Sequence, residues 1–390
     1  MRSGLAFGLC GTAARHKAAL ALYLITCAFG LGLSAEGKDW KRKPVIITFD
    51  APDAGTGEYQ GTYPQGLNAS GEIVGFSLDV NYVLHAFLRA RNGTFTTVEA
   101  PGASPTIGTG AYTINAQGTI GGAYGDDSNV LHGFLRFPEG RFVTFEAPGA
   151  GTGYLQGTLA YSINPEDEVA GPFCDASSVS HGFLRASDGS ISTFEAPNAG
   201  HESAVCGGQG TFVAGTDGLN PQGYVAGNFR DADNVNHGYV RSTDGRITTF
   251  DVPGAGTGAY QGTVGAAINA AGTVPGFYVD PSGADHGLVR AADGTITTFD
   301  VPGAGTGSGQ GTLGQNINTP GAIDGDFVDA NGVSHGFVRS KTGAITTFDV
   351  PGAGTSAGQG TFANQINAMG AITGFYVDAN NVYHGYLLIP

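Results

Sequence analysis

Short runs of alternating apolar and polar residues recur along most of the chain, and turn-forming residues separate them. Residues 335–339, 345–349 and 374–378 are examples, each about the length of one β-strand. Glycine, asparagine and aspartate fill the intervals, as in Ala330-Asn331-Gly332 and Ala292-Asp293-Gly294, and these residues favour tight hairpin turns. The pattern predicts an all-β protein of short antiparallel strands.

The runs belong to a repeat of about 49 residues that is marked by four polar residues at fixed spacing. An asparagine follows isoleucine or leucine, an aspartate comes eleven residues later, a histidine six residues after that, and an acid fourteen residues further on. The asparagines are Asn68, Asn115, Asn164, Asn220, Asn269, Asn318 and Asn367. The aspartates are Asp79, Asp126, Asp175, Asp231, Asp280, Asp329 and Asp378. The histidines are His85, His132, His181, His237, His286, His335 and His384.

The two ends of the chain hold complementary parts of one unit. His384 has no acid after it, whereas Asp50 stands near the start with no unit before it. Four antiparallel strands in a unit of this length are typical of one β-propeller blade. We therefore predict an all-β, seven-bladed β-propeller over residues 45–390, with four strands per blade. Residues 45–51 would be the outer strand of the blade built from residues 361–390, which closes the ring and removes exposed sheet edges.

The length of the repeat varies in one connection only, from each acid to the next asparagine. This gap is 18 residues in most units, 16 after Glu99 and 25 after Glu195. In a propeller these connections cluster on one face, and loops on a rigid scaffold often carry function. The longest connection, residues 196–219, contains His201, Glu202 and Cys206.

Composition and charge narrow the class of protein. Glycine supplies 67 of 390 residues without a three-residue period, which excludes collagen, and 41% hydrophobic residues are too many for a disordered chain. The net charge of −15 leaves no basic surface for nucleic acid. We expect a monomeric protein with no nucleic-acid partner.

The N-terminal residues resemble a targeting segment. Arg2, Arg15 and Lys17 precede an apolar stretch at residues 18–33, which Ser34 and Ala35 follow. This order predicts a secretory signal peptide over residues 1–35 and a short basic linker over residues 36–44. An uncleaved membrane anchor is the alternative. With a cleaved signal, the protein would have no membrane span and would be periplasmic or extracellular.

The histidine-containing strands carry a resemblance to a known family. His85-Ala86-Phe87, His132-Gly133-Phe134 and His335-Gly336-Phe337, in units rich in Thr-Phe-Asp/Glu-x-Pro-Gly, resemble the HAF family of probable extracellular repeat proteins. The resemblance covers about residues 45–390 and implies a secreted repeat protein without naming an activity. The last unit departs from the pattern, because Leu388 stands where the others have arginine.

The repeated histidines and aspartates suggest metal or acid–base chemistry at first, but a structural role fits them better. A catalytic site is needed once, whereas a hydrogen bond that fixes a blade is needed in every blade. We therefore expect no metal and no cofactor. The repeated Gln-Gly-Thr glutamines either brace their loops or form an array for a repetitive ligand such as a glycan; they are Gln60, Gln156, Gln209, Gln261, Gln310 and Gln359.

Residues that differ between the units are the better candidates for a single site. Three positions before each repeated asparagine, in the innermost strand of the predicted blade, the side chains are mostly polar or aromatic. At the channel mouth they would suit a sugar or another small polar ligand. The candidates are Gln65, Tyr112, Tyr161, Asp217, Gln315 and Asn364.

Three classes of function stay open. A secreted, non-catalytic binding or adhesion module is favoured, because no catalytic motif is recognisable. A propeller lyase or hydrolase would use His201 and Glu202 together with channel residues. A structural envelope or matrix protein is the third class. Cys174 and Cys206 lie in adjacent units and could form a disulfide in an oxidising compartment.

Overall fold

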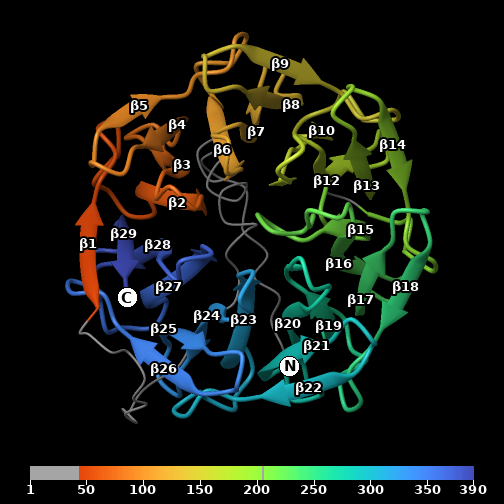
Figure 1. Cartoon of the computed structure of the whole chain (residues 1–390), viewed down its shortest axis with the longest axis vertical. Helices are drawn as coiled ribbons and strands as arrows, with labels where there is room; N and C mark the ends of the chain where they lie inside the picture. Colours follow the sequence, from red (N-terminus) through yellow and green to blue (C-terminus); the bar gives the residue numbers. More distant parts are fainter. Residues whose placement is uncertain (1–43, 204–205) are drawn as a thin grey trace, which may run out of the picture.

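The computed structural model describes residues 44–203 and 206–390. Within these residues all regular structure is β-strand, as predicted, and no helix is long and apolar enough to span a membrane. The strands form antiparallel groups that are arranged radially around a common centre (Figure 1). The expected signal peptide lies outside the described residues, as does the linker except for its last residue.

Each group contains one or two inner strands, two middle strands and an outer strand. The first contains β2 (Gly61–Leu67), β3 (Ile73–Leu78), β4 (Leu84–Arg89) and β5 (Phe95–Thr97). The second contains β6 (Thr109–Ile114), β7 (Ile120–Gly125), β8 (Leu131–Arg136) and β9 (Phe142–Phe145). In the third, two short inner strands, β10 (Gly157–Thr158) and β11 (Ser162–Ile163), precede β12 (Val169–Cys174), β13 (Ser180–Arg185) and β14 (Ile191–Phe194).

The later groups follow the same order. The fourth contains β15 (Gly210–Val213), β16 (Val225–Arg230), β17 (Asn236–Arg241) and β18 (Ile247–Phe250). The fifth contains β19 (Gly262–Gly265), β20 (Val274–Val279), β21 (Asp285–Arg290) and β22 (Ile296–Phe299). The sixth contains β23 (Gly311–Ile317), β24 (Ile323–Val328), β25 (Val333–Arg339) and β26 (Ile345–Phe348). The last contains β27 (Gln359–Ile366), β28 (Ile372–Val377), β29 (Tyr383–Ile389) and β1 (Val45–Phe49).

The N-terminal strand therefore pairs with the C-terminal strand, as the repeat predicted. β1 and β29 are antiparallel, with Val45 opposite Ile389 and Phe49 opposite Gly385. Figure 1 shows β1, in red, beside β29, in blue. The pairing gives the last group the outer strand that its own sequence lacks.

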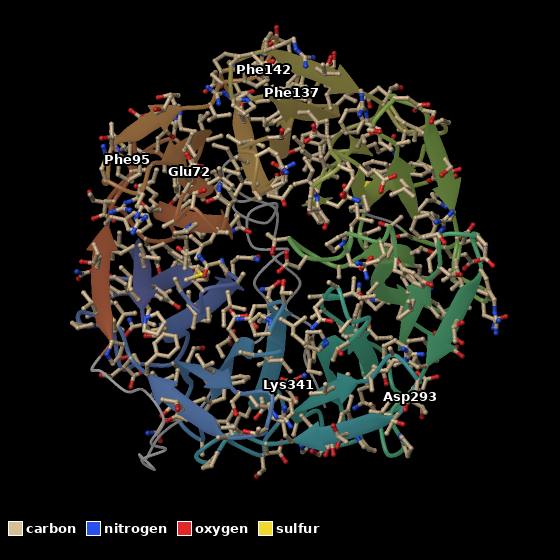
Figure 2. The ribbon with its side chains drawn as sticks, in the orientation of Figure 1. Glu72, Phe95, Phe137, Phe142, Asp293 and Lys341 are labelled. Atoms are coloured by element: carbon tan, nitrogen blue, oxygen red, sulfur yellow. A yellow bond between two sulfur atoms is a disulfide. The ribbon has the colours of Figure 1, made fainter. Side chains whose placement is uncertain are left out.

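The hydrophobic core lies between neighbouring groups. Large rings such as Tyr63, Phe134 and Tyr386 are fully buried there. Outer-strand rings pack on Phe134 and Tyr386, as Phe142 does on Phe134 at a centroid distance of 5.5 Å near the rim (Figure 2). Because each group buries one face against each neighbour, the core is a series of layers rather than one central cluster.

The repeated histidines and aspartates hold turns and strands together, in agreement with the structural role predicted for them. Asp79 shows the pattern: one carboxylate oxygen accepts the backbone N–H groups of Asn81 and Val83, and the other lies 3.4 Å from Nε2 of His85. All seven histidines contact the aspartate six residues earlier, at 3.2–3.7 Å. Among the described residues, no cluster of three or more acids, histidines or cysteines is suited to a metal ion.

Six of the seven repeated asparagines link one group to the next, whereas Asn164 donates to Glu168 of its own group. Asn115 Nδ2 donates to the carbonyl of Asn164 at 3.1 Å, and Asn318 Nδ2 donates to that of Asn367 at 3.1 Å. The last asparagine returns to the first, since Asn367 Nδ2 donates to the carbonyl of Asn68 at 3.0 Å. These side chains stabilise the order of the groups around the centre.

Candidate functional site

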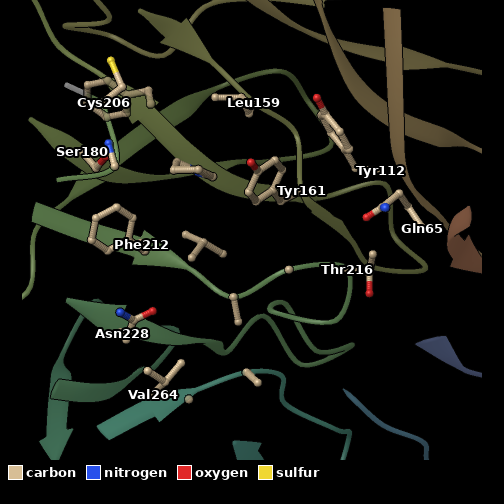
Figure 3. A pocket seen from close by; sticks show the side chains of 18 of the residues that line it. Gln65, Tyr112, Leu159, Tyr161, Ser180, Cys206, Phe212, Thr216, Asn228 and Val264 are labelled. Atoms are coloured by element: carbon tan, nitrogen blue, oxygen red, sulfur yellow. Dashed lines mark hydrogen bonds between the residues drawn. The ribbon is translucent and has the colours of Figure 1, made fainter. Parts of the chain in front are cut away.

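A cavity of about 340 Å³ lies among the inner strands and is the main candidate site (Figure 3). We call it the central cavity. Its apolar wall includes Leu159, Phe212 and Val264. Its polar groups are mostly side-chain amides, from Gln65, Asn228, Gln315, Asn316 and Asn364. Of the described residues that line it, Arg230 alone is charged, and its guanidinium donates to the carbonyls of Gly207 and Gly208.

Four predicted site residues occupy β-bulges in the inner strands. Gln65, Tyr112, Gln315 and Asn364 are each skipped in the register with the neighbouring strand. A bulge leaves one residue outside the ladder and re-aims its side chain. This irregularity explains how residues three positions before the repeated asparagine come to line the central cavity.

Two predicted site residues do not lie in an inner strand, contrary to expectation. Tyr161 falls between β10 and β11, where the strand is interrupted, although it still lines the central cavity. Asp217 follows the end of β15 and lines a second cavity, of about 210 Å³, among the repeated asparagines. Gln365 donates to Asp217 at 2.7 Å, and burial raises the pKa of this carboxyl to about 6.

Two of the residues predicted for the channel mouth are buried beside the central cavity. Gln65 and Tyr112 are only 6% and 8% exposed. The Tyr112 ring meets the Tyr161 ring edge to face, with centroids 5.1 Å apart. Burial raises the pKa of the Tyr112 hydroxyl well above its usual value, so this group stays neutral.

The segment of residues 214–218, which we call the crossing segment, separates the two cavities. Residues 214–216 line the central cavity, and Asp217 lines the second. The carbonyl of Thr216 accepts hydrogen bonds from Thr113 and Ser162, and its hydroxyl donates to Gln365. The crossing segment thereby reaches the second, third and last groups, and it is also hydrogen-bonded to Asn316 of the sixth and Ile268 of the fifth. It is the last part of the longest connection, so residues of that connection line both cavities.

A disulfide holds the same connection near its middle. Cys174 in β12 and Cys206 are bonded, with their Cα atoms 5.7 Å apart, as the sequence suggested. Both cysteines line the central cavity. The disulfide therefore attaches the connection to the third group next to the candidate site.

The residues proposed for a catalytic alternative do not reach the central cavity. His201 and Glu202 are exposed, and neither lines the central cavity. Nδ1 of His201 lies 3.4 Å from Glu195, and the backbone N–H of Glu202 donates to Gln209 at 2.8 Å. The structure thus separates these two side chains from the cavity residues with which they were expected to act.

The repeated glutamines brace their loops, which decides between the two predictions made for them. Gln60 is typical: Oε1 accepts the N–H of Gly57 at 2.8 Å, and Nε2 donates to the carbonyl of Val80 at 3.2 Å. Gln156, Gln209 and Gln261 make the equivalent donation to the following group. These amide groups are used within the protein.

A buried acid pair in β24 was missed at the level of sequence. Asp324 and Asp326 are fully buried or nearly so, and Asp285 of β21 is 1% exposed. Burial, with a smaller contribution from the Asp217 carboxylate, raises the pKa of Asp324 to about 8. Burial likewise raises the pKa values of Asp326 and Asp285 to about 7. The available signal was the break in the repeat, since no other unit has an acid at either β24 position.

Comparison with known proteins agrees with the fold and gives no family. No family model matches the chain, and no curated protein does, so the HAF resemblance stays a prediction. A prolyl endopeptidase structure matches at 11% identity and a TM-score of 0.51, over 94% of this chain and 48% of its own. The BP39L lectin from Burkholderia pseudomallei matches at 12% identity and a TM-score of 0.48, over 73% of this chain and 82% of the lectin.

The fungal lectin of Aleuria aurantia, described as a six-bladed β-propeller, matches at 11% identity and a TM-score of 0.35. That match covers 83% of this chain and 93% of the lectin. At such identities the likeness extends to the fold at most and not to an activity.

Proposed function

We propose that this chain is a secreted, closed seven-bladed β-propeller that binds a small polar ligand, such as a sugar, in the central cavity. The observation that carries the binding proposal is the amide nitrogen of Gln65, which is buried beside the central cavity without a hydrogen-bond partner. Buried polar groups are normally paired, so an unpaired donor at a cavity calls for a ligand atom or a water.

Contacts between the two ends of the chain support the closed ring. Besides the pairing of β1 with β29, Nδ1 of His384 lies 2.9 Å from Asp50. The guanidinium of Arg89 in the first group stacks on the Phe49 ring of β1 at 4.6 Å. Gly61 of β2 pairs with Tyr383 of β29, and a Cβ on Gly61 would overlap the Tyr383 backbone. With β1 included, the last group has the inner, middle and outer strands that the other groups have.

The chemistry of the central cavity supports a neutral, hydroxyl-bearing ligand. Amides both donate and accept hydrogen bonds, and a buried tyrosine hydroxyl that stays neutral does the same. The apolar wall formed by Leu159, Phe212 and Val264 would cover the C–H faces of a ring. A disulfide beside the site supports secretion, because disulfides persist in oxidising compartments.

A screen with matched variants tests the proposal. The mature protein is examined by glycan array and by thermal shift with free sugars, and hits are measured by isothermal titration calorimetry. We expect Gln65→Ala and Tyr161→Ala to weaken binding about tenfold or more, because each removes a side chain that contacts the ligand. Tyr154→Ala is the control, since Tyr154 is 53% exposed and does not line the central cavity.

Each other outcome points to a different function. Equal affinity in wild type and both cavity variants would move the site elsewhere. Conversion of a bound sugar, followed by mass spectrometry, would favour the lyase or hydrolase alternative. Absence of binding across the whole screen would favour a matrix protein and contradict the proposal.

A further inference from the structure

The shortest connection of the repeat, residues 100–108, differs from the others in two ways. It is two residues shorter than most, and Ile107 stands where the other connections have the bracing glutamine. Leu84 N–H still donates to the carbonyl of Ile107 at 2.9 Å, so the connection keeps its attachment to β4. The difference lies in how the connection covers the turn of the preceding group.

In five other connections, a backbone N–H caps that turn. Leu155 donates to the carbonyl of Asn129 at 2.8 Å, and Tyr260 donates to that of Asn234 at 2.7 Å. The equivalent donors are Tyr59, Gly309 and Gly358. In the shortest connection, the N–H of Thr106 instead donates to the hydroxyl of Ser104 at 3.2 Å. The turn of residues 79–83 is therefore left uncovered.

A surface pocket of about 530 Å³ occupies the uncovered space, between the first and second groups. We call it the first-unit pocket. Its polar lining comes from Asp79, Asn81, His85, Glu99, Ser104 and Thr106. None of these residues lines the central cavity, so the two sites are separate.

His85 is the repeated histidine whose second ring nitrogen is not paired with the strand-end acid. In the other six units, Nδ1 lies 2.5–3.6 Å from that acid. In the first unit the acid is Glu99, which accepts a hydrogen bond from the Thr109 hydroxyl at 3.1 Å. Among the described residues, Nδ1 of His85 has no hydrogen-bond partner, and it lies at the first-unit pocket.

We propose that the first-unit pocket is a second binding site, for an uncharged, hydroxyl-rich ring such as a hexose. A carboxylate accepts hydrogen bonds from two neighbouring hydroxyls, and imidazole, amide and hydroxyl groups complete the ring's donors and acceptors. The pocket carries the carboxylates of Asp79 and Glu99 and no Lys or Arg. This charge disfavours anionic ligands.

Ligand-observed saturation-transfer NMR tests the site with four probes: D-mannose, D-galactose, L-fucose and N-acetyl-D-glucosamine. We expect at least one probe to bind the wild type and to bind His85→Ala and Glu99→Gln about tenfold more weakly. His286→Ala and Asp300→Asn are matched controls, because they change the equivalent pair in the fifth group, where Nδ1 is already paired at 2.9 Å. Both controls should bind as the wild type does.

A chimera controls for variants that lose binding only because they unfold. Replacing residues 100–108 with the longer connection 301–311 should close the first-unit pocket, in a conformation that the fold already uses elsewhere. We expect the chimera to melt as the wild type does and to lose binding. Retained binding in the chimera, or no saturation transfer from any probe, would overturn the proposal.

Discussion

At the scale of single residues, the acids of β24 are the least expected feature of the interior. Asp324 and Asp326 occupy alternate positions of one buried strand, and Asp217 of the crossing segment adds to the field at Asp324. A buried carboxylate without a cation beside it favours its neutral form, which is why its pKa rises. Ionisation of these buried carboxyls therefore destabilises the sixth group as the pH rises.

The raised pKa of Asp324 predicts how the stability of Asp324→Asn changes with pH. The folded-state pKa of Asp324 is about 8, against a value of 3.8 for an unperturbed carboxyl. The folded state thus holds the proton more tightly, and stability falls as the pH rises between these two values. We expect Asp324→Asn to melt about 2–4 °C above wild type at a pH of about 9 and close to wild type at a pH of about 5. The exposed Asp127→Asn is the control, and equal melting of Asp324→Asn and wild type at the higher pH would contradict the prediction.

At this scale the sequence was informative where residues repeat and where they break the repeat. The paired roles of histidine and aspartate followed from their occurrence in every unit. Gln65 and Tyr112 were found because they vary between units at one position. The unpaired Nδ1 of His85 was not predictable, because it depends on where the Glu99 carboxylate turns.

At the scale of elements, the longest connection builds much of the candidate site. Its disulfide at Cys206 fixes its middle to the third group, and Thr216 near its end contacts β6, β11 and β27. A loop that is held at two points can form a rigid part of the cavity wall. The sequence placed the additional length correctly but could not show that it crosses the centre, because hydrogen bonds over about 50 to 150 residues of separation leave no local pattern.

The disulfide gives a prediction at the scale of this connection. Replacing Cys174 and Cys206 by serine opens a loop with a sequence separation of 32 residues. We expect the free energy of unfolding to fall by about 3–4 kcal/mol on the chain-entropy model, and ligand affinity at the central cavity to fall with it. Denaturant unfolding measures the change. Dithiothreitol should reproduce it in the wild type and leave the double variant unaffected; an unaffected wild type would contradict the prediction.

The inner strands show where a regular repeat gives irregular structure. The sequence predicted an inner strand in every unit. In four groups this strand continues through a β-bulge, and in the other three it is interrupted or ends early. Bulges and breaks depend on crowding near the centre, where inner strands of different groups converge. Local propensity does not report that crowding.

At the scale of the whole molecule, β1 joins the two ends of the chain. The hydrogen bond from His384 to Asp50, with smaller charge effects from Asp50 and Asp378, raises the pKa of His384 despite its partial burial. A histidine with a raised folded-state pKa stabilises the fold below its ordinary value of 6.5 and loses this contribution as the pH rises through the folded value. The junction between the ends should therefore be strongest in mildly acidic solution.

A comparison of two truncated chains tests the junction. One chain begins at Pro44 and keeps β1, and the other begins at Ala51 and lacks both β1 and Asp50. We expect the shorter chain to lose about 3–5 kcal/mol of unfolding free energy, since each backbone hydrogen bond of the lost strand contributes about 1 kcal/mol. The difference should shrink between a pH of about 5 and a pH of about 8. Equal stability of the two chains would contradict the ring.

The pairing of β1 with β29 also determines the order of events during folding. Synthesis delivers the N-terminus first, yet the partner of Val45 is Ile389, at the far end of the chain. Until that partner emerges, β1 waits as an unpaired strand whose exposed backbone could join a neighbouring molecule. Of the described strands, β1 is thus made first and pairs last, so each new chain passes through a stage in which this strand can pair with a neighbouring chain.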